Sequence, residues 1–269
     1  MDLNLRGKTA LITGGSKGIG RGMAEQLAAE GVNLILVARD VARLGAVSRE
    51  IAETYHVAVR WIEADLYSAS APVEIAAQCP DVDILINNAN TPSAGSLEDI
   101  DEDQWMHNWS LKPFSYIRML RAFLPILRKR EGGVIINVIG QIYQVATNKA
   151  LYSSASCSAL ATVTRALAHD LAKDNIRILG IGAWVVNTEY VVEAYEAKAK
   201  ATLGDGSRWR ELAAHLPFGR GAETKEIGDL AAFLASDKAS YLTGQIIDLD
   251  GGYIGSSVPT LASGALAMR

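Results

Sequence analysis

A run of glycines after the first apolar segment carries the strongest chemical signal in the sequence. Residues 13–20 read Thr-Gly-Gly-Ser-Lys-Gly-Ile-Gly, between an apolar run and a helical pattern. Glycine lets the backbone approach a ligand closely, and the free N–H groups that open a helix attract phosphate. An ordinary tight turn between strand and helix is the alternative interpretation. The turn residues expected to line the site of such a phosphate-bearing ligand are Gly14, Ser16, Lys17, Gly18, Ile19 and Gly20.

The rest of the chain alternates between short runs rich in Val and Ile and longer helical patterns. The runs predicted as strands are 9–13, 33–38, 57–62, 82–87, 134–139, 176–181 and 245–249. The predicted helices are 20–30, 41–54, 103–130, 152–173 and 225–235. Runs that are apolar throughout suit strands buried on both faces, and strand–helix alternation produces a parallel sheet. The sequence predicts an α/β fold: one doubly wound, Rossmann-type domain over residues 1–269, with about seven parallel strands and helices on both faces.

Two segments interrupt this alternation. Residues 189–217 carry several aromatic side chains between the sixth and seventh strands, and are expected to form a helical excursion on the substrate side. A purely structural helical pair is an equally good interpretation. The tail, 255–269, has no charge before its last residue, and both a disordered tail and a subunit contact remain open.

Composition excludes several classes of protein. Hydrophobic residues make up 49% of the chain and charged residues 21%, so a large core is available. The net charge of −4 gives no basic surface for nucleic acid or an anionic membrane. The N-terminus does not resemble a signal peptide, and the two cysteines and four histidines show no metal spacing. We expect a cytoplasmic protein with no metal site.

Several further motifs resemble the short-chain dehydrogenase/reductase family. The glycine spacing Gly14-x3-Gly18-x-Gly20 is similar to that of the family, and Asn87-Asn88-Ala89 matches three positions of its four-residue Asn-Asn-Ala-Gly motif. Tyr152 lies at the position of the catalytic tyrosine, and residues 241–252 are similar to the C-terminal signature. The further cofactor-binding residues that this resemblance implies are Asp65, Leu66, Asn88, Ala89, Val186 and Thr188.

The residues after the second strand indicate which nicotinamide cofactor binds. A carboxylate at the end of that strand would hydrogen-bond a ribose 2′-hydroxyl and repel a 2′-phosphate. Ala38 stands there, followed by Arg39, and Lys17 lies in the glycine turn. Asp40 is expected to cap the next helix instead. Two cations and no acid favour NADP(H) over NAD(H).

The catalytic positions depart from the family pattern. The family places a lysine four residues after the tyrosine, where its charge favours the phenolate, but Ser156 stands there. Ser110 replaces an asparagine, and Ile139 and Gly140 replace a pair of serines. Trp184 occupies part of a Pro-Gly pair. The catalytic candidates are Tyr152, Ser156 and Ser110.

Three functions are compatible with these residues. The first is an NADP(H)-dependent oxidoreductase that moves hydride between nicotinamide and a small carbonyl or alcohol, with Tyr152 as proton donor, Ser156 on the ribose and Ser110 holding a water. The second is an NADP-binding pseudoenzyme, an inert subunit or a redox sensor. The third is a lyase or isomerase. We expect a small and possibly hydrophobic substrate, no nucleic acid or membrane partner, and, from the family resemblance, a homodimer or homotetramer.

Overall fold

The computed structural model describes residues 2–90 and 95–254, and these form a single Rossmann-type domain. Seven parallel strands build one sheet in the order β3-β2-β1-β4-β5-β6-β7. The strands are β1 (Thr9–Thr13), β2 (Asn33–Ala38), β3 (Val59–Glu63), β4 (Ile84–Asn87), β5 (Gly133–Gly140), β6 (Ile176–Ala183) and β7 (Ile246–Leu249). The predicted fold class is confirmed.

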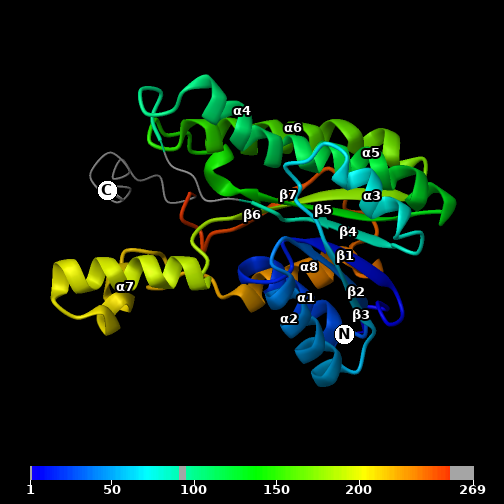
Figure 1. The fold of residues 1–269 in the computed structure, drawn as a ribbon, viewed down its shortest axis with the longest axis horizontal. Coiled ribbons are helices and arrows are strands. Elements are labelled where there is room, and N and C mark those ends of the chain that lie inside the picture. The colour runs from blue at the N-terminus through cyan, green and yellow to red at the C-terminus, as the bar shows by residue number, and fades with distance from the viewer. Residues whose placement is uncertain (1, 91–94, 255–269) are drawn as a thin grey trace.

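Helices cover both faces of the sheet (Figure 1). The helices are α1 (Gly18–Ala29), α2 (Val41–Tyr55), α3 (Ala71–Ala77), α4 (Glu102–Leu111), α5 (Phe114–Lys129), α6 (Leu151–Ala172), α7 (Glu189–Leu203) and α8 (Thr224–Ala235). Three short 3₁₀ helices are η1 (Gln141–Tyr143), η2 (Gly206–Ala213) and η3 (Asp237–Ala239). Helices α1, α2 and α8 pack on one face, and α3, α5 and α6 pack on the other. Local signals set several boundaries: Asp40 caps α2, and Gly204 ends α7 in the left-handed conformation.

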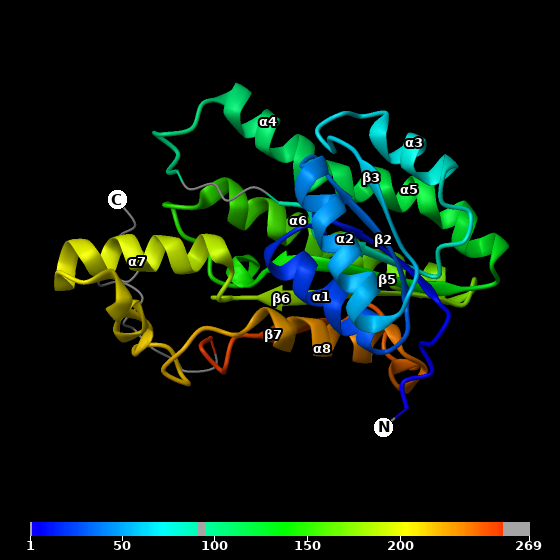
Figure 2. The same ribbon diagram turned by 60° about the horizontal axis from the view of Figure 1, so that its bottom comes forward.

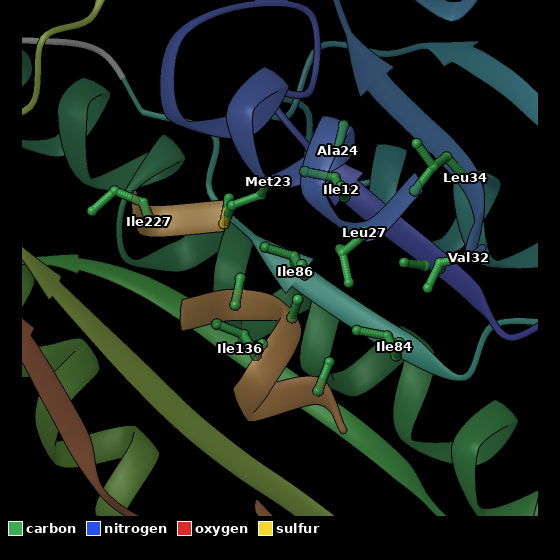
Figure 3. Packing of buried hydrophobic residues seen from close by; sticks show 14 of the residues in the cluster. Ile12, Met23, Ala24, Leu27, Val32, Leu34, Ile84, Ile86, Ile136 and Ile227 are labelled. Carbon is green, nitrogen blue, oxygen red and sulfur yellow. The ribbon is translucent and has the colours of Figure 1, made fainter. Parts of the chain in front are cut away.

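Two buried clusters, one on each side of the sheet, hold these layers together. Figure 3 shows Ile12 and Ile86 of the central strands against Met23 and Leu27 of α1. Side chains alternate along each strand, so that Leu11, Ile35 and Leu85 face the opposite cluster. Both faces of the central strands are therefore buried away from water, as their continuous apolar sequence predicts.

The structure corrects three details of the predicted elements. The expected helix over residues 103–130 is two helices, because Lys112 precedes Pro113 and takes an extended conformation. Strand β3 is not buried on both faces: Arg60, Trp61 and Glu63 are exposed, since β3 is an edge strand. Helix α3 was not among the predicted helices.

The expected excursion between the sixth and seventh strands forms α7 and η2. These helices project from one side of the sandwich in both ribbon views (Figures 1 and 2). They pack on one another through the ring stack of Tyr195 and Trp209, whose centroids are 6.4 Å apart. The tail 255–269 lies outside the described residues.

The strand order reverses at the centre of the sheet. Strands β2 and β4 lie on either side of β1, so the connections from β1 and β4 leave in opposite directions. Ligands of doubly wound sheets bind at such a switch point, beyond the carboxyl ends of the strands. The glycine turn follows β1 and Asn88 follows β4, so both lie at this point.

Candidate functional site

The glycine turn is shaped to expose backbone N–H groups to a ligand. Gly14 has a φ of +67°, and a side chain at Gly20 would overlap the carbonyl oxygen of Gly14. Helix α1 begins at Gly18, and the preceding Lys17 has an extended conformation with no side-chain cap. The first N–H groups of a helix have no intrahelical partner, and the helix dipole makes this end positive. The turn can therefore bind a pyrophosphate.

Residues after β4 fix the turn in place. The Asn88 side chain donates its amide N–H groups to the carbonyl oxygens of Thr13, at 2.9 Å, and of Gly14, at 3.3 Å. The backbone N–H groups of Asn88 and Ala89 donate to the Thr13 hydroxyl at 2.8 and 3.1 Å. Ser16, inside the turn, is buried. In this structure Asn88 and Ala89 are thus supports of the turn.

Two cations stand free near the end of β2. Asp40 does cap α2, accepting a hydrogen bond from the Arg43 N–H group at 3.0 Å. Lys17 and Arg39 are exposed, and neither forms an ion pair with any residue in the described ranges. The Arg39 guanidinium lies 5.9 Å from the ring centroid of Tyr67, within the range of cation–π attraction. Both cations are available to an anion.

The next two candidates, Asp65 and Leu66, have different surroundings. Asp65 is exposed and accepts a hydrogen bond from the Tyr67 N–H group at 3.1 Å, whereas Leu66 is buried in the core. Tyr67 in turn stacks on His107 of α4, with ring centroids 4.3 Å apart. Tyr67, which sequence reasoning missed, therefore connects Arg39 to α4.

The segment that follows β6 contacts the glycine turn. Val186 is buried and pairs with Ala222, and Thr188 caps α7 by accepting a hydrogen bond from the Val191 N–H group at 3.3 Å. A side chain at Gly18 would lie 3.3 Å from the Thr188 methyl group. The structure thus brings Thr188 against the turn, while Ile19 packs against the core.

Tyr152 lies at the start of α6 with its hydroxyl buried. The residue is 4% exposed, and its hydroxyl has no hydrogen-bond partner of regular geometry among the described residues. Trp105 of α4 lies edge-on to the ring, at 6.2 Å between centroids. Burial raises the pKa of Tyr152, and the nearby Ser153 hydroxyl opposes only part of that rise. At neutral pH the phenol is protonated, so it can donate a proton.

The two serine candidates direct their hydroxyls into their own helices. The Ser156 hydroxyl is buried and donates to the carbonyl oxygen of Ser153 at 3.0 Å. The Ser110 hydroxyl donates to the carbonyl oxygen of Met106 at 3.0 Å. Neither carries a positive charge to replace a lysine. Lys112 is buried and donates to the carbonyl oxygen of Val138 in β5 at 3.1 Å, a structural contact.

A cavity of about 580 Å³ opens beyond the ends of β6 and β7. Its lining includes Trp184, Phe218, Asp248 and Asp250. Sequence reasoning assigned the two carboxylates only to a terminal signature. Their spacing of two residues at the carboxyl end of β7, where extended backbone puts alternate side chains on one side, was the signal that could have found them.

The described residues contain neither a metal-ligand cluster nor a helix that could span a membrane. Between residues 2 and 90 and between 95 and 254, no group of three His, Cys, Asp or Glu side chains could hold a metal ion. Every helix in the same ranges is too short or too polar to cross a bilayer.

Comparison with known proteins identifies the family. A short-chain dehydrogenase family model described as enoyl-(acyl carrier protein) reductase matches residues 14–254, which span the sheet and the site. The chain belongs to the short-chain dehydrogenase/reductase family.

Individual members of the family align over nearly the whole chain. L-xylulose reductase of Bos taurus is 30% identical, over 94% of this chain and 99% of the relative. Galactitol 2-dehydrogenase of Agrobacterium fabrum is 32% identical, over 93% of this chain and 98% of the relative. The structure of L-sorbose reductase from Gluconobacter frateurii, complexed with NADPH and L-sorbose, matches with a TM-score of 0.88 and 31% identity. It covers 93% of this chain and 98% of that one. This short-chain dehydrogenase/reductase thus resembles oxidoreductases in both sequence and fold.

Proposed function

We propose that the protein is an NADP(H)-dependent oxidoreductase acting on a small carbonyl or alcohol. The observation that carries the proposal is the free cation pair, Lys17 and Arg39, beside a second strand that ends in Ala38. A 2′-phosphate needs cations and the absence of a carboxylate, and this edge of the sheet offers both. The structure of L-sorbose reductase with NADPH supports the same cofactor.

The turn fits the rest of such a cofactor. A side chain at Gly20 would overlap the Gly14 carbonyl oxygen, so only glycine keeps the cradle open for a pyrophosphate. Helix α1 would hold that group at its N-terminus, Asn88 would keep the turn in position, and Arg39 with Lys17 would hold the 2′-phosphate. When bound, the nicotinamide supplies or accepts the hydride.

Tyr152 would supply the proton that a reduced carbonyl needs. Its phenol is protonated at neutral pH because burial raises its pKa and no lysine stands one turn later. A protonated phenol suits carbonyl reduction, whereas alcohol oxidation needs the phenolate as base. Serine in place of lysine at position 156 therefore favours reduction as the direction at neutral pH.

A cofactor-binding pseudoenzyme is the second candidate. Its supporting observation is that the hydroxyls of Ser156 and Ser110 both donate within their own helices. Such a protein would bind NADP⁺ with the same residues and would reduce no carbonyl. The two candidates differ only in turnover.

Calorimetric titration with NADP⁺ and NAD⁺, followed by NADPH oxidation with a panel of carbonyl compounds, tests the proposal. We expect tighter binding of NADP⁺, and turnover that is lost in Tyr152→Phe while the NADP⁺ dissociation constant changes less than about twofold. Binding without turnover would establish the pseudoenzyme instead. Failure to bind either cofactor would overturn both candidates.

We also propose that the chain forms a homodimer or homotetramer. Small side chains on α6 that are exposed or partly exposed, such as Ala155, Ser158 and Ala166, would permit close packing of two copies. Light scattering on the purified protein measures the assembly, and a mass near 28.8 kDa would mean a monomer.

A further inference from the structure

The pairing of β2 with β3 brings a tyrosine beside the free cation Arg39. Arg39 follows β2 directly, and Tyr67 lies in the segment after β3. The two strands are parallel, and their last residues, Ala38 and Glu63, are partners in the register. Their carboxyl ends therefore reach the same edge of the sheet. The Arg39 guanidinium lies over the face of the Tyr67 ring, 5.9 Å from its centroid.

The Tyr67 ring is held by contacts of its own. The ring of His107, in α4, stacks on it with centroids 4.3 Å apart and 12° between the ring planes. The Tyr67 N–H group donates to the Asp65 carboxylate at 3.1 Å, which fixes the backbone. The side chain is half-buried and packs against the core cluster that contains Leu66. A ring with these neighbours has little freedom, so it offers Arg39 a fixed surface.

Arg39 needs such a surface because no carboxylate holds it. The side chain is exposed and forms no ion pair with the residues at 2–90 and 95–254. A free arginine side chain samples many rotamers, and fixing it on a phosphate costs conformational entropy. A ring that attracts the guanidinium before the ligand arrives lowers this cost.

The contact with Tyr67 leaves the hydrogen-bonding capacity of Arg39 intact. Cation–π attraction acts through the face of the ring and uses no N–H donor. The guanidinium can therefore still donate two parallel hydrogen bonds to phosphate oxygens. A carboxylate in place of the ring would use these donors and would also repel the phosphate. An aromatic ring is thus a support that does not compete with the ligand.

We propose that Tyr67 is a positioning residue that holds Arg39 for the 2′-phosphate of NADP(H) and so contributes to the preference for this cofactor. This inference rests on the proposed NADP(H)-dependent function and adds a specificity-determining residue to it. Because NAD(H) has no 2′-phosphate, a side chain that acts through Arg39 affects NADP(H) alone. A side chain that only supports the fold around the shared adenosine would affect both cofactors.

Calorimetric titration of the full chain with NADP⁺ and with NAD⁺ tests the role of the ring. Tyr67→Leu keeps an apolar side chain against the core and removes the ring. We expect it to raise the NADP⁺ dissociation constant about two- to fivefold, as for the loss of an exposed cation–π contact, and to leave NAD⁺ binding unchanged. Tyr67→Phe keeps the ring and should bind NADP⁺ like wild type. Tyr55→Leu, at the far end of α2, is the matched control and should change neither affinity.

A double-mutant cycle with Arg39→Ala shows whether Tyr67 acts through Arg39. Residues that act as one unit have non-additive effects. We expect Tyr67→Leu to cause no further loss of NADP⁺ binding once Arg39 has been replaced. Thermal melting of each variant shows that it is folded.

Four results would overturn the positioning role. These are unchanged NADP⁺ binding in Tyr67→Leu, an equal loss of NAD⁺ binding, an equal loss in Tyr67→Phe, and a loss of the same size in the Arg39→Ala background. Each of them can occur while wild type still prefers NADP⁺, and the proposed function then stands without this residue. Wild type that shows no preference for NADP⁺ would overturn the proposed cofactor, and this inference with it.

Discussion

Replacing Arg39 by alanine separates the two nicotinamide cofactors. Arg39 follows the last residue of β2, and its guanidinium lies over the Tyr67 ring. NADP⁺ and NAD⁺ differ by the 2′-phosphate alone, so the loss of a side chain that binds this group affects only NADP⁺. We expect weaker NADP⁺ binding in Arg39→Ala and unchanged NAD⁺ binding.

The exposure of Arg39 sets the size of the effect. A hydrogen bond to a charged group contributes about 1.5–3 kcal/mol when well formed. Arg39 is exposed, and water and salt screen its charge, so a value of about 1–2 kcal/mol is appropriate. This free energy corresponds to an increase of about 5- to 30-fold in the NADP⁺ dissociation constant. The change for NAD⁺ should be below about twofold.

Calorimetric titration at low and at near-physiological salt measures both parts of this prediction. Screening weakens exposed charge pairs, so the loss should be larger at about 0.01 M than at about 0.15 M ionic strength. Arg49→Ala is the matched control, because Arg49 is an exposed arginine in α2, the helix that follows Arg39. Equal weakening of NADP⁺ and NAD⁺ in Arg39→Ala, or an equal loss in Arg49→Ala, would refute the assignment of Arg39 to the 2′-phosphate.

Three further predictions concern the turn, the phenol and an ion pair. In Gly20→Ala the added methyl group collides with the backbone of the turn, so NADP⁺ should no longer raise the melting temperature; a preserved shift would contradict the close approach. Burial raises the pKa of Tyr152, so alcohol oxidation should still be rising at the alkaline end of the pH profile, and Ser156→Lys should move that rise to lower pH; identical pH–rate profiles would argue against Tyr152 as the acid–base group. Pairing with Arg220 lowers the pKa of Glu226 to about 2. Because the folded-state pKa is depressed, the stabilisation is present above about 4.5 and is lost as the pH falls toward 2. Glu226→Gln should therefore lower the free energy of unfolding by at most about 1 kcal/mol at pH 7, since the pair is exposed, and the difference from wild type should disappear near pH 2 in urea titrations.

Local signals made much of the fold predictable. The central strands are buried on both faces and so read as continuous apolar runs, and Asp40 and the glycine turn mark helix starts through their own chemistry. The helix break at Lys112 is also local, because the proline that follows disfavours helix at the preceding residue. Strand β3 was misjudged since its place at the sheet edge depends on the order of all the strands.

Some features of the candidate site also follow from the local sequence, and others depend on tertiary packing. The sequence by itself determined the glycine turn, the missing acid at Ala38 and the substitution at Ser156, because each follows from residue type and spacing along one segment. Only the tertiary structure decided that Trp105 lies edge-on to the Tyr152 ring and that Tyr143 reaches Asp248 from 105 residues away. These contacts depend on how separate helices and strands pack. Their distances are set by the whole core, and no single segment of the chain encodes them.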